Sequence, residues 1–312
     1  MKSSLKGKSL LTLKDWTPEE VRQVLDLSLQ VKKERKSGKL LQRFQGRTLA
    51  LLFEKRSTRT RCAFETAFGE EGGHSVFLSA ADIHLGVKET LEDTARVLGR
   101  MFDAIQFRGF KQSTVETLAR WSGVPVYNGL TDDWHPTQAL ADLMTMEEAF
   151  GSLKGRKLAF VGDGRNNVAN TLLVGCAQMG VSISIVAPAS LCPAPEHVEW
   201  AASLGKRTGA VVRVSTDVAE GVKGADAVYT DVWVSMGEED KSAERIATLS
   251  PYQVNGELMK KTGNKDSIFL HCLPAVREKE VTAEVIDGPR SRVWDEAENR
   301  KHTIKAVMLA TL

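Results

Sequence analysis

The sequence predicts an α/β protein of two domains, each a parallel β-sheet flanked by helices. A chain of 312 residues is longer than one compact core usually holds. Short apolar runs alternate with helix-like patterns along it, which is the order of βαβ units. The alternation stops at 151–155 and starts again at 157–161. We therefore expect a domain boundary near residue 150.

Composition restricts the class of partner. Lysine and arginine exceed aspartate and glutamate by only 2, so no general attraction to nucleic acid is expected. No apolar stretch approaches the ~20 residues that span a bilayer, so no membrane partner is expected. The four cysteines form no Cys-x-x-Cys pair, which gives a zinc site no support and suits a reducing cytoplasm.

Individual elements follow from local patterns. A first helix begins after Thr17, where Pro18 and the capping-box residue Glu20 mark its first turn. Strands of the first domain are predicted at 48–53, 76–78, 104–107 and 124–127, and helices at 57–68, 89–101, 113–121 and 135–150. The second domain is predicted to contain strands at 157–161, 182–186, 211–214, 227–229 and 268–270, a helix through Leu173 and Met179, and a final helix at 296–309.

The loop Ser57-Thr58-Arg59-Thr60-Arg61 follows a predicted strand and opens a helix. Free backbone N–H groups and the positive helix end favour an anion there, and arginine matches phosphate with a rigid fork of donors. The loop lacks the glycines and lysine of a Walker motif. The alternative is a capped helix with solvated basic residues, but the run of donors at this junction favours a phosphate site.

Two further loops of the first domain carry polar residues at ligand-facing positions. Arg108 follows a predicted strand, and the carboxyl ends of parallel strands are where ligands bind. His135 and Gln138 share one face of the helix that begins there. An imidazole beside a positive helix end stays uncharged more easily and can donate to a carbonyl. A surface arginine and a capping histidine are the alternatives.

The turn Gly162-Asp163-Gly164 resembles a dinucleotide fingerprint only in part. The third glycine position holds Asn167, and the next strand ends at Ala187-Pro188 without an acidic residue for a ribose. We interpret the turn as presenting Asn167 to a ligand.

Later strand ends favour an amino-acid ligand. Asp231 offers a carboxylate to an amine and Ser235 a hydroxyl, while the backbone near Met236 can meet a carboxylate. Cys272 ends the last clear strand, where it is expected to line the site. His271 is the only adjacent candidate base, which is little support for a nucleophilic thiolate. A solvated loop and a packing cysteine are the alternatives.

Together these motifs resemble the ornithine carbamoyltransferases of the aspartate/ornithine carbamoyltransferase superfamily. The resemblance rests on Ser-Thr-Arg-Thr-Arg at 57–61, His-Pro-Thr-Gln at 135–138, Asp231 with Ser-Met-Gly at 235–237, and His-Cys-Leu-Pro at 271–274. Asp-Ile-His-Leu-Gly at 82–86 and Glu-Ala-Glu-Asn-Arg at 296–300 also fit. The motifs occur in family order over nearly the whole chain.

The resemblance implies transfer of a carbamoyl group from carbamoyl phosphate to L-ornithine, giving L-citrulline and phosphate without metal or cofactor. It implies domains at 1–148 and 149–289, with a C-terminal helix at 290–312 returning to the first, and a homotrimer or multiple of trimers with shared active sites. The implied carbamoyl phosphate residues are Ser57, Thr58, Arg59, Thr60, His84 of a neighbouring subunit, Arg108, His135, Gln138, Cys272, Leu273 and Arg300. Those around the reacting carbon are Thr60, Arg108, His135 and Cys272, and the ornithine residues are Asn167, Asp231, Ser235 and Met236. Some relatives have glutamine in place of His84, and either side chain can donate a hydrogen bond.

Three alternatives remain at this point. One is a carbamoyltransferase with another acceptor, such as putrescine, an acylated ornithine or aspartate. Another is a nucleotide-dependent dehydrogenase, against which the incomplete fingerprint counts. The third is a phospho-ligand binding protein, which needs the first loop but no acceptor loop.

Overall fold

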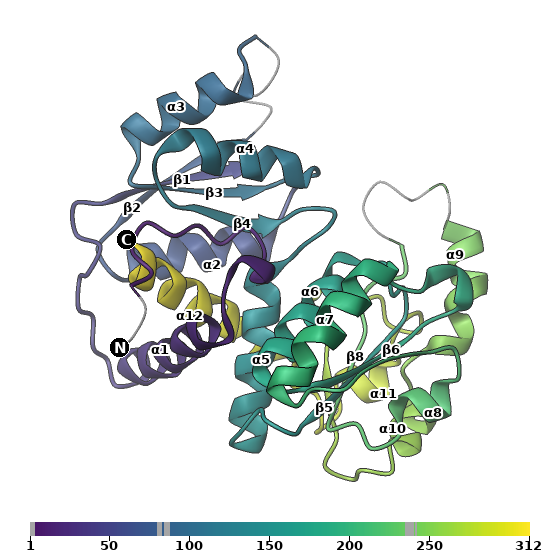
Figure 1. Cartoon of the computed structure of the whole chain (residues 1–312). Coiled ribbons are helices and arrows are strands. Elements are labelled where there is room, and N and C mark those ends of the chain that lie inside the picture. The colour runs from purple at the N-terminus through teal and green to yellow at the C-terminus, as the bar shows by residue number, and fades with distance from the viewer. Residues whose placement is uncertain (1–3, 80–82, 84–87, 235–239, 241) are drawn as a thin grey trace. The chain divides into compact units, whose positions relative to one another are not determined.

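The computed structural model describes residues 4–79, 83, 88–234, 240 and 242–312. The chain forms two compact units (Figure 1), unit 1 being Met1–Met144 with Glu298–Leu312 and unit 2 being Thr145–Ala297. Each contains one parallel sheet, which confirms the predicted α/β class. In the part of the chain that the structure describes, no helix is long and apolar enough to cross a membrane.

Unit 1 contains a four-stranded parallel sheet in the order β2-β1-β3-β4. Its strands are β1 (Thr48–Phe53), β2 (His74–Ser79), β3 (Ala104–Arg108) and β4 (Val126–Leu130). Its helices are η1 (Leu13–Asp15), α1 (Pro18–Lys36), α2 (Thr58–Gly69), α3 (Leu91–Met101), α4 (Gln112–Ser122), the first part of α5 (Pro136–Phe150) and most of α12 (Val293–Thr311).

The sheet of unit 1 is covered on both faces, as βαβ crossovers require. Leu98 of α3 and Leu118 of α4 pack with Ile105 and Phe107 of β3 in one buried cluster. Figure 1 shows α1, α2 and α12 on the opposite face. The N-terminal segment joins that layer, where the Gly7 N–H donates to the carbonyl of Thr311 near the C-terminus (2.7 Å).

Strand β4 lies later in the chain than predicted. The expected span was 124–127, whereas the strand covers Val126–Leu130. Pro125 has no N–H to donate. The pairing instead continues past Asn128, with an irregularity that matches Arg108 to Leu130. A β-carbon at Gly129 would lie 2.4 Å from the amide nitrogen of Gln106, so a larger residue there would displace this buried side chain.

Unit 2 contains a five-stranded parallel sheet in the order β7-β6-β5-β8-β9. Its strands are β5 (Lys157–Val161), β6 (Ser182–Val186), β7 (Val212–Ser215), β8 (Ala227–Tyr229) and β9 (Ile268–Leu270). Its helices are α6 (Asn167–Met179), η2 (Ala189–Leu191), α7 (Pro195–Thr208), α8 (Val218–Val222), α9 (Ser242–Leu249), η4 (Ser250–Tyr252), α10 (Gly256–Lys261) and α11 (Ala283–Ile286). One face packs into a buried cluster with α8, α10 and α11, and Figure 1 shows α6 and α7 over the other.

Candidate active site

The hydroxyl of Thr60 is the meeting point of two arginines in unit 1. Ser57 caps α2 by accepting the Thr60 N–H (3.2 Å), which places Thr60 in the first helical turn. Arg108, at the end of β3, donates from Nη1 to Thr60 Oγ1 (3.1 Å), and Arg300 of α12 donates from Nη2 to the same oxygen (3.1 Å). Because two donors occupy the lone pairs of this oxygen, its own O–H is left to donate to a ligand.

Arg300 connects Thr60 to the start of α5. Its Nη1 donates to Gln138 Oε1 (2.6 Å), and its Nη2 also lies 3.4 Å from the hydroxyl of Thr137. Gln138 in turn donates to Asp142 Oδ1 (2.8 Å), one turn further along the helix. The side chains of this chain of contacts are buried, so its geometry is fixed before a ligand binds.

His135 is buried at the start of α5 and is held in its neutral form. Burial lowers the pKa of this imidazole well below 6.5, and the positive charges of Arg300, Arg108 and Arg59 lower it further. A neutral imidazole among cations can hydrogen-bond a ligand without adding positive charge.

The rest of the predicted phosphate loop is accessible. Ser57 and Arg59 are half-buried and Thr58 is exposed, at the N-terminal turn of the 12-residue helix α2. Arg61 is directed elsewhere, since it pairs with Glu65 (3.0 Å) and stacks over Phe77. The predicted residue His84 lies outside the described residues.

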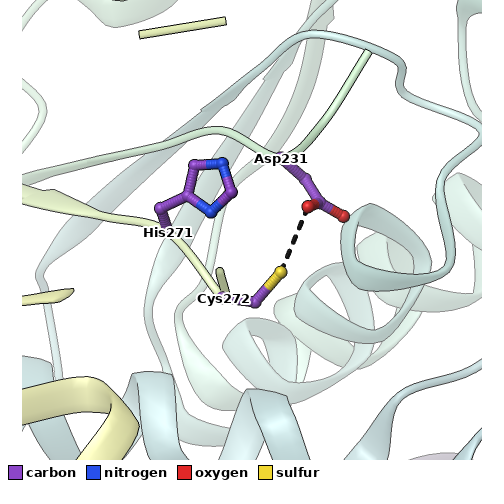
Figure 2. A group of neighbouring side chains, drawn as sticks. All are labelled: Asp231, His271 and Cys272. Atoms are coloured by element: carbon purple, nitrogen blue, oxygen red, sulfur yellow. Dashed lines mark hydrogen bonds between the residues drawn. The ribbon is translucent and has the colours of Figure 1, made fainter. Parts of the chain in front are cut away.

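In unit 2, Asp231 is the centre of a second cluster, at the carboxyl ends of β5, β8 and β9. Asn166 donates to its Oδ2 (2.8 Å), and the Val232 N–H donates to its Oδ1 (2.8 Å). The thiol of Cys272 also donates to Oδ1 (3.1 Å), as Figure 2 shows. Three donors thus converge on this carboxylate and fix its orientation.

His271 lies beside this pair (Figure 2), and the donor atoms of Asp231, His271 and Cys272 lie within 4.8 Å of one another. That spacing suits a metal ion. Contacts within the chain already engage all three groups, however, because His271 Nδ1 accepts the Leu273 N–H (2.8 Å) and the thiol donates to Asp231. Leu273 itself has φ of +59°.

The turn after β5 also places Asn166 beside Asp231, and the predicted residue Asn167 follows it. Asn166 caps α6 by accepting the Val168 N–H (2.6 Å) and so directs its amide nitrogen at Asp231. Asn167 is half-buried as the first helical residue. The local signal for Asn166 is its place directly before an apolar helical run, which is typical of a cap.

Asp163, in the same turn, forms ion pairs with two arginines. Arg245 of α9 and Arg165 both contact its carboxylate, and Arg245 is buried whereas Arg165 is exposed. Helix α9 begins just after the segment that carries the predicted ligands Ser235 and Met236, which lie outside the described residues. Sequence reasoning missed this pair, since an arginine eighty residues away gives no local signal.

Two parallel α/β units, each with a polar cluster at its strand ends, are the frame of a two-substrate transferase, and comparisons with known proteins identify its family. Residues 8–148 match the carbamoyl-P binding domain of aspartate/ornithine carbamoyltransferase, and residues 154–311 match its Asp/Orn binding domain. The chain therefore belongs to the aspartate/ornithine carbamoyltransferase family.

Similar proteins carry a more specific name. The ornithine carbamoyltransferase of Caldanaerobacter subterraneus subsp. tengcongensis is 66% identical over 312 residues, all of both chains. That of Thermotoga petrophila is 63% identical, again over the full length of both. Among solved structures, ornithine carbamoyltransferase from Pyrococcus furiosus superimposes with a TM-score of 0.96 at 45% identity, covering 99% of this chain and 98% of that one.

Proposed function

We propose that this protein is an ornithine carbamoyltransferase, which transfers the carbamoyl group of carbamoyl phosphate to the side-chain amine of L-ornithine. The products are L-citrulline and phosphate. One observation carries the proposal: the Thr60 hydroxyl accepts from both Arg108 and Arg300 beside the neutral imidazole of His135. This arrangement presents several donors to a polarised carbonyl oxygen.

Carbamoyl phosphate has two ends, and unit 1 offers a group of residues for each. The first turn of α2 supports phosphate binding through its N–H groups, with Ser57, Thr58 and Arg59 around it. Thr60, Arg108 and His135 suit the carbamoyl oxygen. Gln138 and Arg300 hold these donors in position. We assign Cys272 and Leu273 of unit 2 to carbamoyl phosphate on the family pattern.

The reaction begins when the neutral amine of ornithine attacks the carbamoyl carbon. As the carbon–nitrogen bond forms, negative charge grows on the carbamoyl oxygen, where Thr60, Arg108 and His135 stabilise it. The bond from the carbamoyl carbon to the phosphate oxygen then breaks, and the leaving phosphate takes the proton that the attacking nitrogen loses. Arg59 and the positive end of α2 offset the charge on the leaving phosphate.

Unit 2 supplies the residues for ornithine. Asp231 suits the cationic α-amine, because Asn166, Val232 and Cys272 hold its carboxylate in one orientation. We assign Ser235 and Met236 to the α-carboxylate on the family pattern, and Asn167 to the same head group. A carboxylate placed in this way favours an amino acid over an acceptor that lacks the α-amine charge, such as an acylated ornithine.

We also propose a cytoplasmic homotrimer, or a multiple of it, in which His84 completes the site of a neighbouring subunit. The family pattern supports this assembly. Mixed trimers of Arg59→Ala and His84→Ala subunits should be more active than either variant alone, since some sites would then contain both intact residues. Verified mixed trimers that are no more active than the two variants would exclude an active site shared between subunits.

The function is tested by supplying carbamoyl phosphate with ornithine, putrescine, N-acetylornithine or aspartate and identifying the ureido product. Citrulline from ornithine alone is expected. A matched pair tests the phosphate loop: Arg59→Ala should lower kcat/KM for carbamoyl phosphate about 100-fold. Arg61→Ala should change it little, because Arg61 pairs with Glu65 on the helix surface. No ureido product with any amine would exclude the transferase.

A further inference from the structure

The backbone of His271 is fixed by a buried carboxylate. His271 follows β9 and is fully buried. Its N–H donates to Glu296 Oε2 (3.0 Å), while the other oxygen of Glu296 accepts from the hydroxyl of Tyr229 (3.2 Å). The first residue after the strand therefore has a defined position from which its ring can act on the loop that follows.

The ring of His271 reaches over Cys272 to the next peptide. The Leu273 N–H donates to its Nδ1 at 2.8 Å, so the neutral ring carries its hydrogen on Nε2. Nε2 lies 3.5 Å from Glu280 Oε1, and this buried carboxylate also accepts the Val276 N–H. Both ring nitrogens are thus directed at groups other than the thiol, which argues against His271 as a base for Cys272.

The peptide held by this ring has an uncommon conformation. Leu273 has φ of +59°, a left-handed conformation that L-residues adopt only at a cost. The hydrogen bond to His271 stabilises that turn. The residue enclosed by the turn is Cys272, whose thiol lies 3.1 Å from Asp231 Oδ1.

We propose that His271 is a positioning residue, whose Nδ1 holds the Leu273 peptide and thereby sets the Cys272 thiol on Asp231. The expected effect of this role on ornithine kinetics rests on the proposed function, in which Asp231 binds the ornithine α-amine. Its structural consequence is independent of any substrate. The role belongs to one atom, the acceptor at the δ position of residue 271.

An isosteric pair of substitutions isolates that atom. In His271→Asn an oxygen occupies the δ position and can accept the Leu273 N–H, whereas in His271→Leu a methyl group occupies it. Both variants remove Nε2 and leave the same space near Glu280. A difference between them therefore reports the δ acceptor, and melting temperatures identify a variant that fails to fold.

Two readouts are expected to separate the pair. Alkylation of Cys272 by iodoacetamide, followed by peptide mass spectrometry, should be several-fold faster in His271→Leu than in wild type, because the thiol leaves the carboxylate. His271→Asn should alkylate at nearly the wild-type rate. The kcat/KM for ornithine should fall about 100-fold in His271→Leu, which is the effect expected when a site is misplaced by about 1 Å. In His271→Asn it should stay within about threefold of the wild-type value.

The two readouts distinguish the failure of each proposal. A wild-type protein that makes no citrulline sinks the proposed function, and the alkylation contrast then still tests the position of the thiol. Equal alkylation rates in the Asn and Leu variants, both folded, would overturn the role of His271. If His271→Leu does not fold, the ¹⁵N–¹H resonance of the Leu273 amide decides, because it should keep its hydrogen-bonded shift in His271→Asn.

Discussion

Arg300 contacts three side chains of unit 1 from a helix at the far end of the chain. Its two Nη atoms divide between Gln138 on α5 and Thr60 on α2, with Thr137 nearby. This division needs the planar fork of a guanidinium, since an ammonium is a point charge on a flexible stem. Arg300 therefore fixes the direction in which the Thr60 hydroxyl donates.

Arg300→Lys should lower kcat/KM for carbamoyl phosphate about 100-fold, the usual effect of losing one stabilising donor. The positive charge is kept, so the loss reports geometry. Arg292→Lys is a control from the residue before α12, because Arg292 donates only to backbone carbonyls in its contacts with Pro289 and Ser291. Steady-state kinetics with carbamoyl phosphate as the varied substrate measure both. An unchanged Arg300→Lys enzyme would place Arg300 outside the site.

The sequence indicated most of the residues that the structure joins in unit 1, and the reasons are local. Thr60 and Arg108 follow strand ends, and His135 opens a helix, positions that face ligands in parallel α/β folds. Arg300 came only from the family pattern, because a residue inside a terminal helix carries no such mark. Asn166 was not predicted beside Asp231, since the exact start of α6 decides which residue becomes the cap, and Asn167 stays a prediction.

At the scale of elements, α9 is attached to the turn after β5 by Arg245 and Asp163. Arg245 is buried, and the carboxylate of Asp163 also pairs with exposed Arg165. The pair thus connects the helix that follows the proposed Ser235–Met236 ligands to the turn that carries Asn166. Loss of this attachment should affect ornithine more than carbamoyl phosphate.

Arg245→Met should therefore raise KM for ornithine about tenfold, through displacement of α9. Arg165→Met is the matched control, because an exposed partner of the same carboxylate contributes little, about 0–1 kcal/mol. Ornithine saturation curves for both variants, with melting temperatures alongside, give the comparison. Equal KM values for the two variants would mean that α9 does not depend on the buried pair.

Helix α12 is held to unit 1 by the carboxylate of Glu70, which follows α2. Lys305 (2.8 Å), Lys301 (3.0 Å) and Arg35 of α1 (3.0 Å) all contact it. Burial raises the pKa of Glu70, but these three cations outweigh burial and lower it to about 2 from 4.5. Stability from Glu70 is thus fully present above pH 4.5 and is lost as the pH falls toward 2.

Glu70→Gln should lower the free energy of unfolding at pH 7 by about 1–2 kcal/mol, after allowance for solvent screening of a partly exposed network. The deficit should shrink as the pH falls below 4.5, where wild type also loses the charge. Urea unfolding at pH 7 and pH 3 measures it. Glu257→Gln, which breaks an exposed pair with Lys260, should behave as wild type at both pH values. If the loss of unfolding free energy in Glu70→Gln were the same at both pH values, the charge of Glu70 would not be what stabilises α12.

The predicted elements matched best where a continuous apolar run ends in polar residues. Strands β1, β5, β6, β8 and β9 have the predicted bounds for this reason. Helices α7 to α11 were not predicted, because several are short and capped by single side chains such as Asn255 before α10. Their position depends on packing against the sheet of unit 2, which local pattern does not contain.

At the scale of the whole molecule, two helices run through the boundaries between the units. Helix α5 crosses from Met144 to Thr145, and α12 from Ala297 to Glu298. As a result the last residues of the chain, Arg300 among them, contribute to unit 1, although the matched Asp/Orn binding domain extends to residue 311. The domain limits predicted from the sequence at 148 and 289 stay predictions.

This division of residues predicts that carbamoyl phosphate binding survives the loss of the ornithine ligand. The proposed phosphate and carbamoyl-oxygen donors all belong to unit 1, whereas Asp231 belongs to unit 2. In Asp231→Asn, carbamoyl phosphate at 100 times its Kd should still stabilise the fold by about 2.7 kcal/mol, as in wild type. Thermal unfolding with and without the ligand measures the shift, and Arg59→Ala, which removes a phosphate ligand, should reduce it. If Asp231→Asn abolished the stabilisation, binding of carbamoyl phosphate would have to depend on unit 2, and the assignment of its main contacts to unit 1 would be wrong.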